Sequence, residues 1–184
     1  SSVQKLFRRA DAVIVNLECP LEYSLLPPKP PFGANARWAR RLHDSGITAV
    51  ALANNHALDQ GPRGLSNTLT ALRKAGVAFF GAGFDEKGAF QPFILEKNGL
   101  RIAFVAFFGL SRQAPHGFQA AYMADASEAS VFQAVTQARG QADHVVAVFH
   151  WGMEGDEYPG TKQRLLARTA VKAGASMVVG HHPH

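Results

Sequence analysis

Short apolar runs alternate with amphipathic stretches along most of the chain. Runs without polar interruption predict strands that are buried on both faces, at residues 12–15, 47–53, 77–80, 145–149 and 176–179. Helical periodicity and capping residues predict helices at residues 3–10, 35–44, 61–75, 125–139 and 162–173, and Gly76 is expected to end the third of them. This alternation predicts an α/β fold in layers, with at least part of the sheet parallel.

One segment departs from the alternation. Residues 93–96 and 100–108 are mostly apolar, and Asn98-Gly99 between them is the strongest short signal for a β-hairpin, so an antiparallel element is expected there. The Pro-rich residues 27–31 cannot form a helix. Residues 109–121 lack periodicity and are expected to form a loop over the functional site.

Length and composition are typical of one globular domain. The chain has 184 residues, of which 47% are hydrophobic, and we expect a single, partial domain over residues 1–184. No run approaches the roughly 18 apolar residues of a membrane span, so membrane association is expected only through a segment outside this chain. The chain opens on Ser1 without a leader pattern, which leaves the cell envelope and the cytoplasm open as locations. Its one cysteine, Cys19, cannot form an internal disulfide.

The net charge is +5, but the basic residues are scattered. They form no dense run with interleaved aromatic side chains, so solvated helix faces are favoured over a nucleic-acid surface. A cationic balance favours an anionic substrate, either a small molecule or a polymer.

Four polar clusters each follow an expected strand. They are Asn16-Leu17-Glu18, the residues from Asn54 to Gly61, His150-Trp151-Gly152-Met153-Glu154, and Gly180-His181-His182-Pro183-His184. If these strands are parallel neighbours, the clusters lie along the same sheet edge, where α/β proteins bind ligands.

The first two clusters offer oxygen ligands and one histidine. Glu18 is either a surface carboxylate or a ligand that can bridge two cations, and Asn55 is either a turn residue or an amide-oxygen ligand. His56 either caps a helix or donates a proton to a leaving group. Asp59 is expected to support these residues or to cap the next helix. Asn54 is expected to support the site or to contact the substrate.

The last two clusters offer imidazoles. His150 is either a satisfied buried histidine or a metal ligand, and Trp151 is expected to pack or to line a pocket. His182 and His184 are two residues apart, so in an extended segment they point to the same side, with the supporting residue His181 on the other. Glu154 and Glu157 are expected to be exposed acids or substrate contacts.

The candidate ligands mix oxygen and nitrogen and include no thiolate. They are Glu18, Asn55, His150, His182 and His184. This set favours Mn²⁺, Fe²⁺ or Zn²⁺. Two such ions about 3.5–4 Å apart would clamp an oxyanion and activate water.

These motifs resemble the calcineurin-like metallophosphoesterase superfamily, and more closely the bacterial capsule synthesis protein CapA family, which is involved in making poly-γ-glutamate. The matching stretches are residues 15–21, 53–61, 150–152 and 174–184. The resemblance implies a layered, mixed β-sheet sandwich flanked by helices. It also implies that Glu18 bridges two metals, that Asn55, His150 and His182 hold one, that His184 helps hold the other, and that His56 donates the proton.

The chain also departs from that pattern. The superfamily's opening Gly-Asp strand is expected upstream of residue 1, and further strands are expected beyond His184, so the fold is expected to be truncated at both ends. Weak or partial metal occupancy is expected for the same reason. The preferred function is metal-dependent hydrolysis of a phosphoester or a γ-glutamyl amide. The alternatives are a non-hydrolytic role in binding, transferring or exporting an anionic polymer, and an inactive fragment.

Overall fold

The computed structural model describes residues 2–22, 32–110 and 123–184. The helices are α1 (Ser2–Phe7), α2 (Trp38–Asp44), α3 (Gly61–Ala75), α4 (Glu86–Ala89), α5 (Glu128–Arg139) and α6 (Thr161–Lys172). The strands are β1 (Ile14–Asn16), β2 (Ala49–Ala51), β3 (Ala78–Phe80), β4 (Phe93–Lys97), β5 (Leu100–Phe108), β6 (His144–His150) and β7 (Met177–His181). Among the described helices, none is long and apolar enough to cross a membrane.

The strands form two sheets. In the first, β1, β2 and β3 are parallel and lie in that order, with Val15 beside Val50 and Val50 beside Phe79. In the second, the order is β4, β5, β6 and β7, and only the β4–β5 pair is antiparallel. That pair is the predicted hairpin, and Asn98 and Gly99 in its turn both have positive φ, of 53° and 79°.

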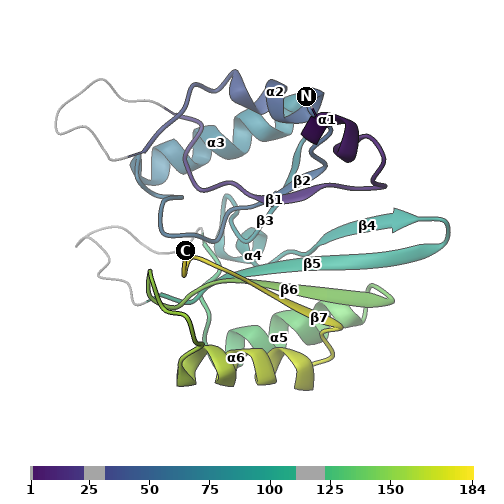
Figure 1. The fold of residues 1–184 in the computed structure, drawn as a ribbon, viewed down its shortest axis with the longest axis vertical. Helices are drawn as coiled ribbons and strands as arrows, with labels where there is room; N and C mark the ends of the chain where they lie inside the picture. Colours follow the sequence, from purple (N-terminus) through teal and green to yellow (C-terminus); the bar gives the residue numbers. More distant parts are fainter. Residues whose placement is uncertain (1, 23–31, 111–122) are drawn as a thin grey trace.

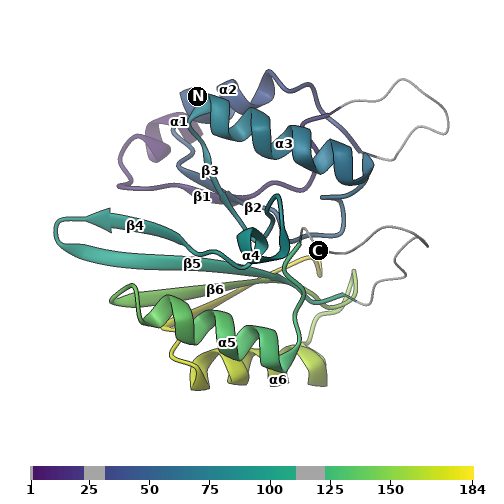
Figure 2. The same ribbon diagram turned by 180° about the vertical axis from the view of Figure 1, so that it is seen from behind.

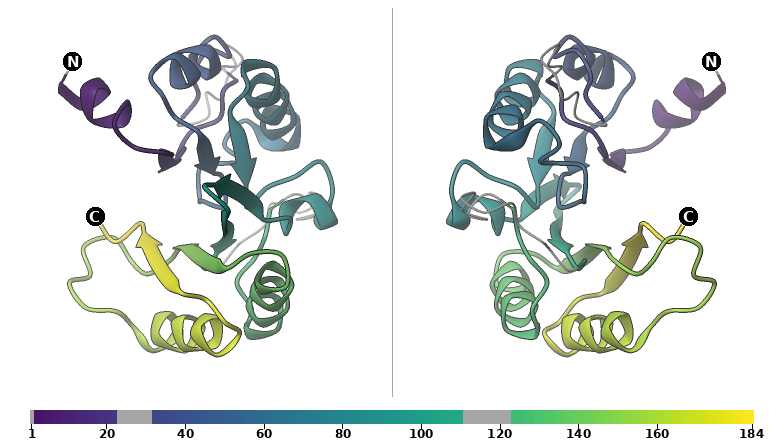
Figure 3. Two further views of the ribbon diagram at one scale, coloured as in Figure 1. Left: turned by 90° about the vertical axis from the view of Figure 1, so that its right-hand side faces the viewer. Right: turned by 90° about the vertical axis from the view of Figure 1, so that its left-hand side faces the viewer.

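The two sheets lie between two layers of helices (Figure 1). Helices α2 and α3 cover the outer side of the first sheet, whereas α5 and α6 cover the outer side of the second, as the view from behind also shows (Figure 2). Viewed from the side, the order is helices, sheet, sheet, helices (Figure 3). The predicted α/β fold, with layered, mixed sheets flanked by helices, is confirmed.

Each sheet has its own helical cover because each helix presents an apolar face. Leu65, Leu69 and Leu72 of α3 are buried against the first sheet, whose central strand β2 is buried throughout. Val131 of α5 and Leu166 of α6 are buried with the strands of the second sheet. A half-polar helix packed on a fully apolar strand is what the periodicity predicts.

The sheets approach each other closely near the ends of β2 and β3. The Phe80 ring lies 6.0 Å from the Phe104 ring, measured between centroids. Gly81 has a φ of 81°, and a Cβ there would lie 2.7 Å from the Ala106 Cβ and 2.9 Å from the Ala53 Cβ. Glycine therefore lets the second sheet pack against Ala53, the residue directly before the Asn54–His56 cluster.

Several element bounds differ from the sequence prediction. The strand expected at 47–53 is shorter and covers only Ala49–Ala51. Beyond Ala51 the chain leaves the strand and leads into the polar cluster that begins at Asn54. The helix expected from 125 begins at Glu128, after Ser127 caps it by accepting from the Ser130 N–H. Helix α4 was not predicted, because four residues carry no periodicity. The loop expected at 109–121 lies largely outside the described residues, as do residues 27–31.

Candidate metal centre

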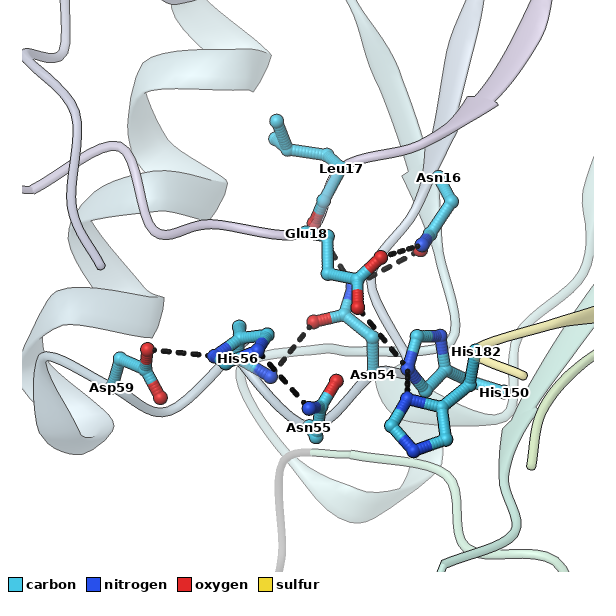
Figure 4. Close-up of polar contacts among 9 residues, drawn as sticks. All are labelled: Asn16, Leu17, Glu18, Asn54, Asn55, His56, Asp59, His150 and His182. Atoms are coloured by element: carbon cyan, nitrogen blue, oxygen red, sulfur yellow. Dashed lines mark hydrogen bonds and ion pairs between the residues drawn. The ribbon is translucent and has the colours of Figure 1, made fainter. Parts of the chain in front are cut away.

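The four polar clusters follow β1, β2, β6 and β7, which belong to two different sheets. The sequence suggested a single sheet edge, and the structure corrects this: two clusters come from neighbouring strands of the first sheet and two from neighbouring strands of the second. The sheets bring them together because the carboxyl ends of β1, β2, β6 and β7 meet on the same side of the molecule (Figures 1 and 4). The candidate centre therefore lies between the sheets.

Glu18, His150 and His182 form the middle of the site. The Glu18 Oε1 atom lies 3.3 Å from His150 Nε2, and His150 Nε2 lies 3.2 Å from His182 Nδ1. Two atoms that bind one cation at about 2.1 Å are themselves separated by about 3.0–3.4 Å in tetrahedral or octahedral geometry. These two separations fit one divalent cation, and since ligand atoms of all three residues lie within 4.8 Å of one another, the three residues form a candidate metal-binding group.

His150 is suited to bind a cation because it is held neutral. Its side chain is 2% exposed, and burial lowers its pKa to about 3, with a smaller contribution from the other histidines around it. A neutral imidazole offers the lone pair that a metal requires. Among the described residues, two buried side-chain polar atoms have no hydrogen-bond partner, namely His150 Nδ1 and Asn55 Oδ1.

Asn55, His56 and Asp59 form a hydrogen-bonded chain beside this group (Figure 4). His56 Nδ1 lies 2.9 Å from Asp59 Oδ2, and a carboxylate can only accept, so Nδ1 carries the proton. Nε2 then accepts from the Asn55 amide at 3.1 Å. The Asn55 nitrogen is used in this contact, which leaves its buried Oδ1 available as an oxygen ligand.

Asn54 and Asn16 fix this arrangement without facing a cation themselves. The Asn54 amide, which is fully buried, donates to Asn16 Oδ1 and to the Leu17 carbonyl, and its oxygen accepts from the His56 N–H. Asn16 in turn donates to Glu18 Oε2 at 2.9 Å. The role of Asn16 was missed from the sequence, although it belongs to the first polar cluster. Together these two amides join the ends of β1 and β2.

Replacing Asn54 with Leu is expected to lower the free energy of unfolding by about 3 kcal/mol, because three buried or half-buried partners lose their hydrogen bonds. Urea denaturation measures the change. The matched control is Asn67→Leu, since Asn67 is half-buried and bonds through its side chain to Glu22. Equal losses in the two variants would contradict the joining role of Asn54.

The C-terminal histidines are not extended as predicted. His182 has a φ of 101°, which is strained for a residue with a side chain, and the His184 N–H donates to the His182 carbonyl at 2.6 Å. The segment therefore turns at His182. The turn leaves the His182 and His184 rings 6.1 Å apart, measured between centroids, and both belong to a second candidate metal-binding group, with Glu154 as its third member. The role of Glu154 was open from the sequence alone.

Trp151 and His181 support the centre from the second sheet. The Trp151 ring stacks on Phe149 at 4.2 Å between centroids, and the Trp151 backbone N–H donates to the His181 carbonyl. The His181 side chain is half-buried, and burial lowers its pKa, partly offset by the charge of Glu18. Trp151 therefore packs against Phe149, and His181 lies close enough to Glu18 to feel its charge.

The whole of residues 1–184 matches the family described as bacterial capsule synthesis protein PGA_cap. The chain is 34% identical to the PGA biosynthesis protein CapA of Bacillus subtilis (strain 168), over 99% of this chain and 50% of that protein. It is 33% identical to the capsule biosynthesis protein CapA of Bacillus anthracis, over 82% of this chain and 38% of that protein. The chain thus spans half the length, or less, of these two relatives.

A crystal structure of a hypothetical protein from Thermus thermophilus has a similar fold. Its TM-score is 0.61 at 22% sequence identity, and the match covers 99% of this chain and 60% of that one.

Proposed function

The chain belongs to the bacterial capsule synthesis protein family PGA_cap, and from this premise we propose that it is a metal-dependent hydrolase that acts on an anionic substrate in capsule biosynthesis. The observation that carries the proposal is the convergence of Glu18 Oε1, His150 Nε2 and His182 Nδ1 from two sheets, with neighbouring separations of 3.3 and 3.2 Å. Two imidazoles and a carboxylate, without thiolates, suit Mn²⁺, Fe²⁺ or Zn²⁺.

In this proposal Glu18, Asn55, His150 and His182 hold the first cation, and His184 helps to hold a second. The unpaired Asn55 Oδ1 and the low pKa of His150 support these roles. A bound divalent cation supplies Lewis acidity and lowers the pKa of water, which is the chemistry that hydrolysis needs.

His56 is the residue placed to move a proton. Asp59 fixes its ring through Nδ1, so that Nε2 points toward Asn55 and the centre. To protonate a leaving oxygen or nitrogen as the bond breaks, the imidazole must carry a proton at Nε2 as well as at Nδ1. It takes up this second proton from solvent, and the Asn55 amide then gives up its contact with Nε2. The edge of the Phe32 ring packs against the His56 ring, with centroids 4.3 Å apart, and shields one of its faces from water.

The substrate class follows from charge and from the relatives. A net charge of +5 favours an anion, and the two curated relatives are named for PGA and capsule biosynthesis. A phosphoester and a γ-glutamyl amide are both anionic compounds that water can cleave with metal assistance. A second candidate function is the binding, transfer or export of an anionic polymer without hydrolysis, which the same charge and the same names favour.

The test is hydrolysis by the purified chain after EDTA treatment and reloading with Mn²⁺ or Zn²⁺. Three substrates are compared: p-nitrophenyl phosphate, bis-p-nitrophenyl phosphate and poly-γ-glutamate, the last by its length on a gel. We expect turnover with the cation and none with EDTA. If the purified chain binds poly-γ-glutamate without shortening it, and releases no nitrophenol from either phosphate, the second function is favoured instead.

A further inference from the structure

We infer that Glu154 supplies the carboxylate of a second divalent-cation position, which it forms with His182 and His184. Ligand atoms of these three residues lie within 4.8 Å of one another. His182 belongs to this group and also to the one formed with Glu18 and His150, so the two positions are adjacent. The inference rests on the proposed function, because it adds a ligand to the same centre.

The backbone of the loop after β6 explains how Glu154 reaches the histidines. Gly152 and Gly155, on either side of Met153-Glu154, have φ values of 87° and 82°, a conformation that glycine adopts without strain. A Cβ at Gly152 would lie 2.7 Å from the Gln163 side chain and 3.2 Å from Pro183 Cγ. The loop therefore lies against Pro183, the residue between the two histidines.

The chemistry of the group suits a dication. One carboxylate offsets part of the positive charge, and two imidazoles provide nitrogen donors, as in the commonest mixed sites for Zn²⁺ and Mn²⁺. Glu154 and His184 are exposed, so the position is open to solvent and can take water or a substrate oxygen as a further ligand. The strained φ of His182 directs one side chain toward both groups.

Sharing His182 has a measurable consequence. A neutral imidazole has one nitrogen lone pair, so while the first cation binds His182, the second position keeps only Glu154 and His184 of its three ligands. The position that contains Glu154 is therefore the weaker of the two. Loss of the Glu154 carboxylate would then leave this position with His184 as the remaining ligand of its group.

The experiment is Mn²⁺ binding to the purified chain, measured by isothermal titration calorimetry and by electron paramagnetic resonance. The wild-type chain is expected to bind two ions with different affinities. Glu154→Gln should weaken Mn²⁺ binding at the weaker position at least tenfold. Glu157→Gln is the matched control, because Glu157 is an exposed acid of the same loop that joins neither metal-binding group of the described residues.

A second variant separates this inference from the proposed function. Glu18→Gln should weaken the tighter position and leave the one with Glu154 measurable, and circular dichroism checks that each variant is folded. Two ions bound by Glu154→Gln with wild-type affinities would overturn the role of Glu154 and leave the proposed function standing. No Mn²⁺ or Zn²⁺ bound by the wild-type chain would overturn both.

Discussion

Replacing His150 with Ala is expected to lower the rate of metal-dependent hydrolysis by about a thousandfold or more. His150 Nε2 lies between Glu18 Oε1 and His182 Nδ1. The substitution therefore removes the central one of the three proposed cation ligands. A ligated cation contributes several kcal/mol to the stabilisation of a hydrolytic transition state, and each 1.4 kcal/mol is about tenfold in rate. The measurements are the rate at saturating Mn²⁺ and the affinity for Mn²⁺ by calorimetry.

The matched control for this variant is His144→Ala. His144 lies at the opposite end of the same strand, is exposed, and contacts the Ser176 hydroxyl at 3.1 Å. It should keep wild-type activity and wild-type metal affinity. Because His150 is buried, thermal unfolding of His150→Ala is compared as well, and Glu18→Gln serves as a second loss-of-ligand variant at a more exposed position. Full activity in both ligand variants would contradict a metal centre at this place.

Local sequence signals predicted much of the fold. Helix α3 was predicted with its observed bounds because three leucines recur on one face and Gly76, with a φ of 78°, ends it. The hairpin was predicted because Asn98 and Gly99 tolerate positive φ. The resemblance implied a sandwich of sheets, but the assignment of each strand to one sheet or the other could not be predicted, since it depends on the packing of Phe80 against Phe104 and on the close approach at Gly81.

The candidate site was predictable as a set of residues, but not as an arrangement. Glu18, Asn55 and His150 each follow an apolar strand, and this placement identified them. The turn at His182 and the approach of Glu154 were not predictable, because they arise from contacts between loops far apart in the chain. The sequence contains several exposed acids in that loop, and only the course of the backbone through Gly152 shows which one faces the histidines.

Replacing His56 with Asn is expected to lower the rate of hydrolysis by about 10²- to 10⁴-fold, the usual contribution of a general acid, without changing cation affinity. The loss should depend on the leaving group. Nitrophenolate leaves without a proton, whereas an alkoxide or an amine needs one, so an alkyl phosphate or a γ-glutamyl amide should lose far more activity than p-nitrophenyl phosphate. Asp59→Asn should show the same dependence on the leaving group to a smaller extent. It changes only the carboxylate that orients the His56 ring, which lies 2.9 Å from Nδ1 of that ring.

The chain provides a close control for this experiment in a second histidine–aspartate pair. His43 Nδ1 lies 3.3 Å from Asp44 Oδ1 on the exposed side of α2, remote from the strand ends that form the centre. His43→Asn should leave every rate unchanged. If His56→Asn slows all substrates equally and also weakens Mn²⁺ binding, then His56 maintains the shape of the metal centre and does not deliver a proton. A rate loss that grows with the basicity of the leaving group is the result that only proton donation explains.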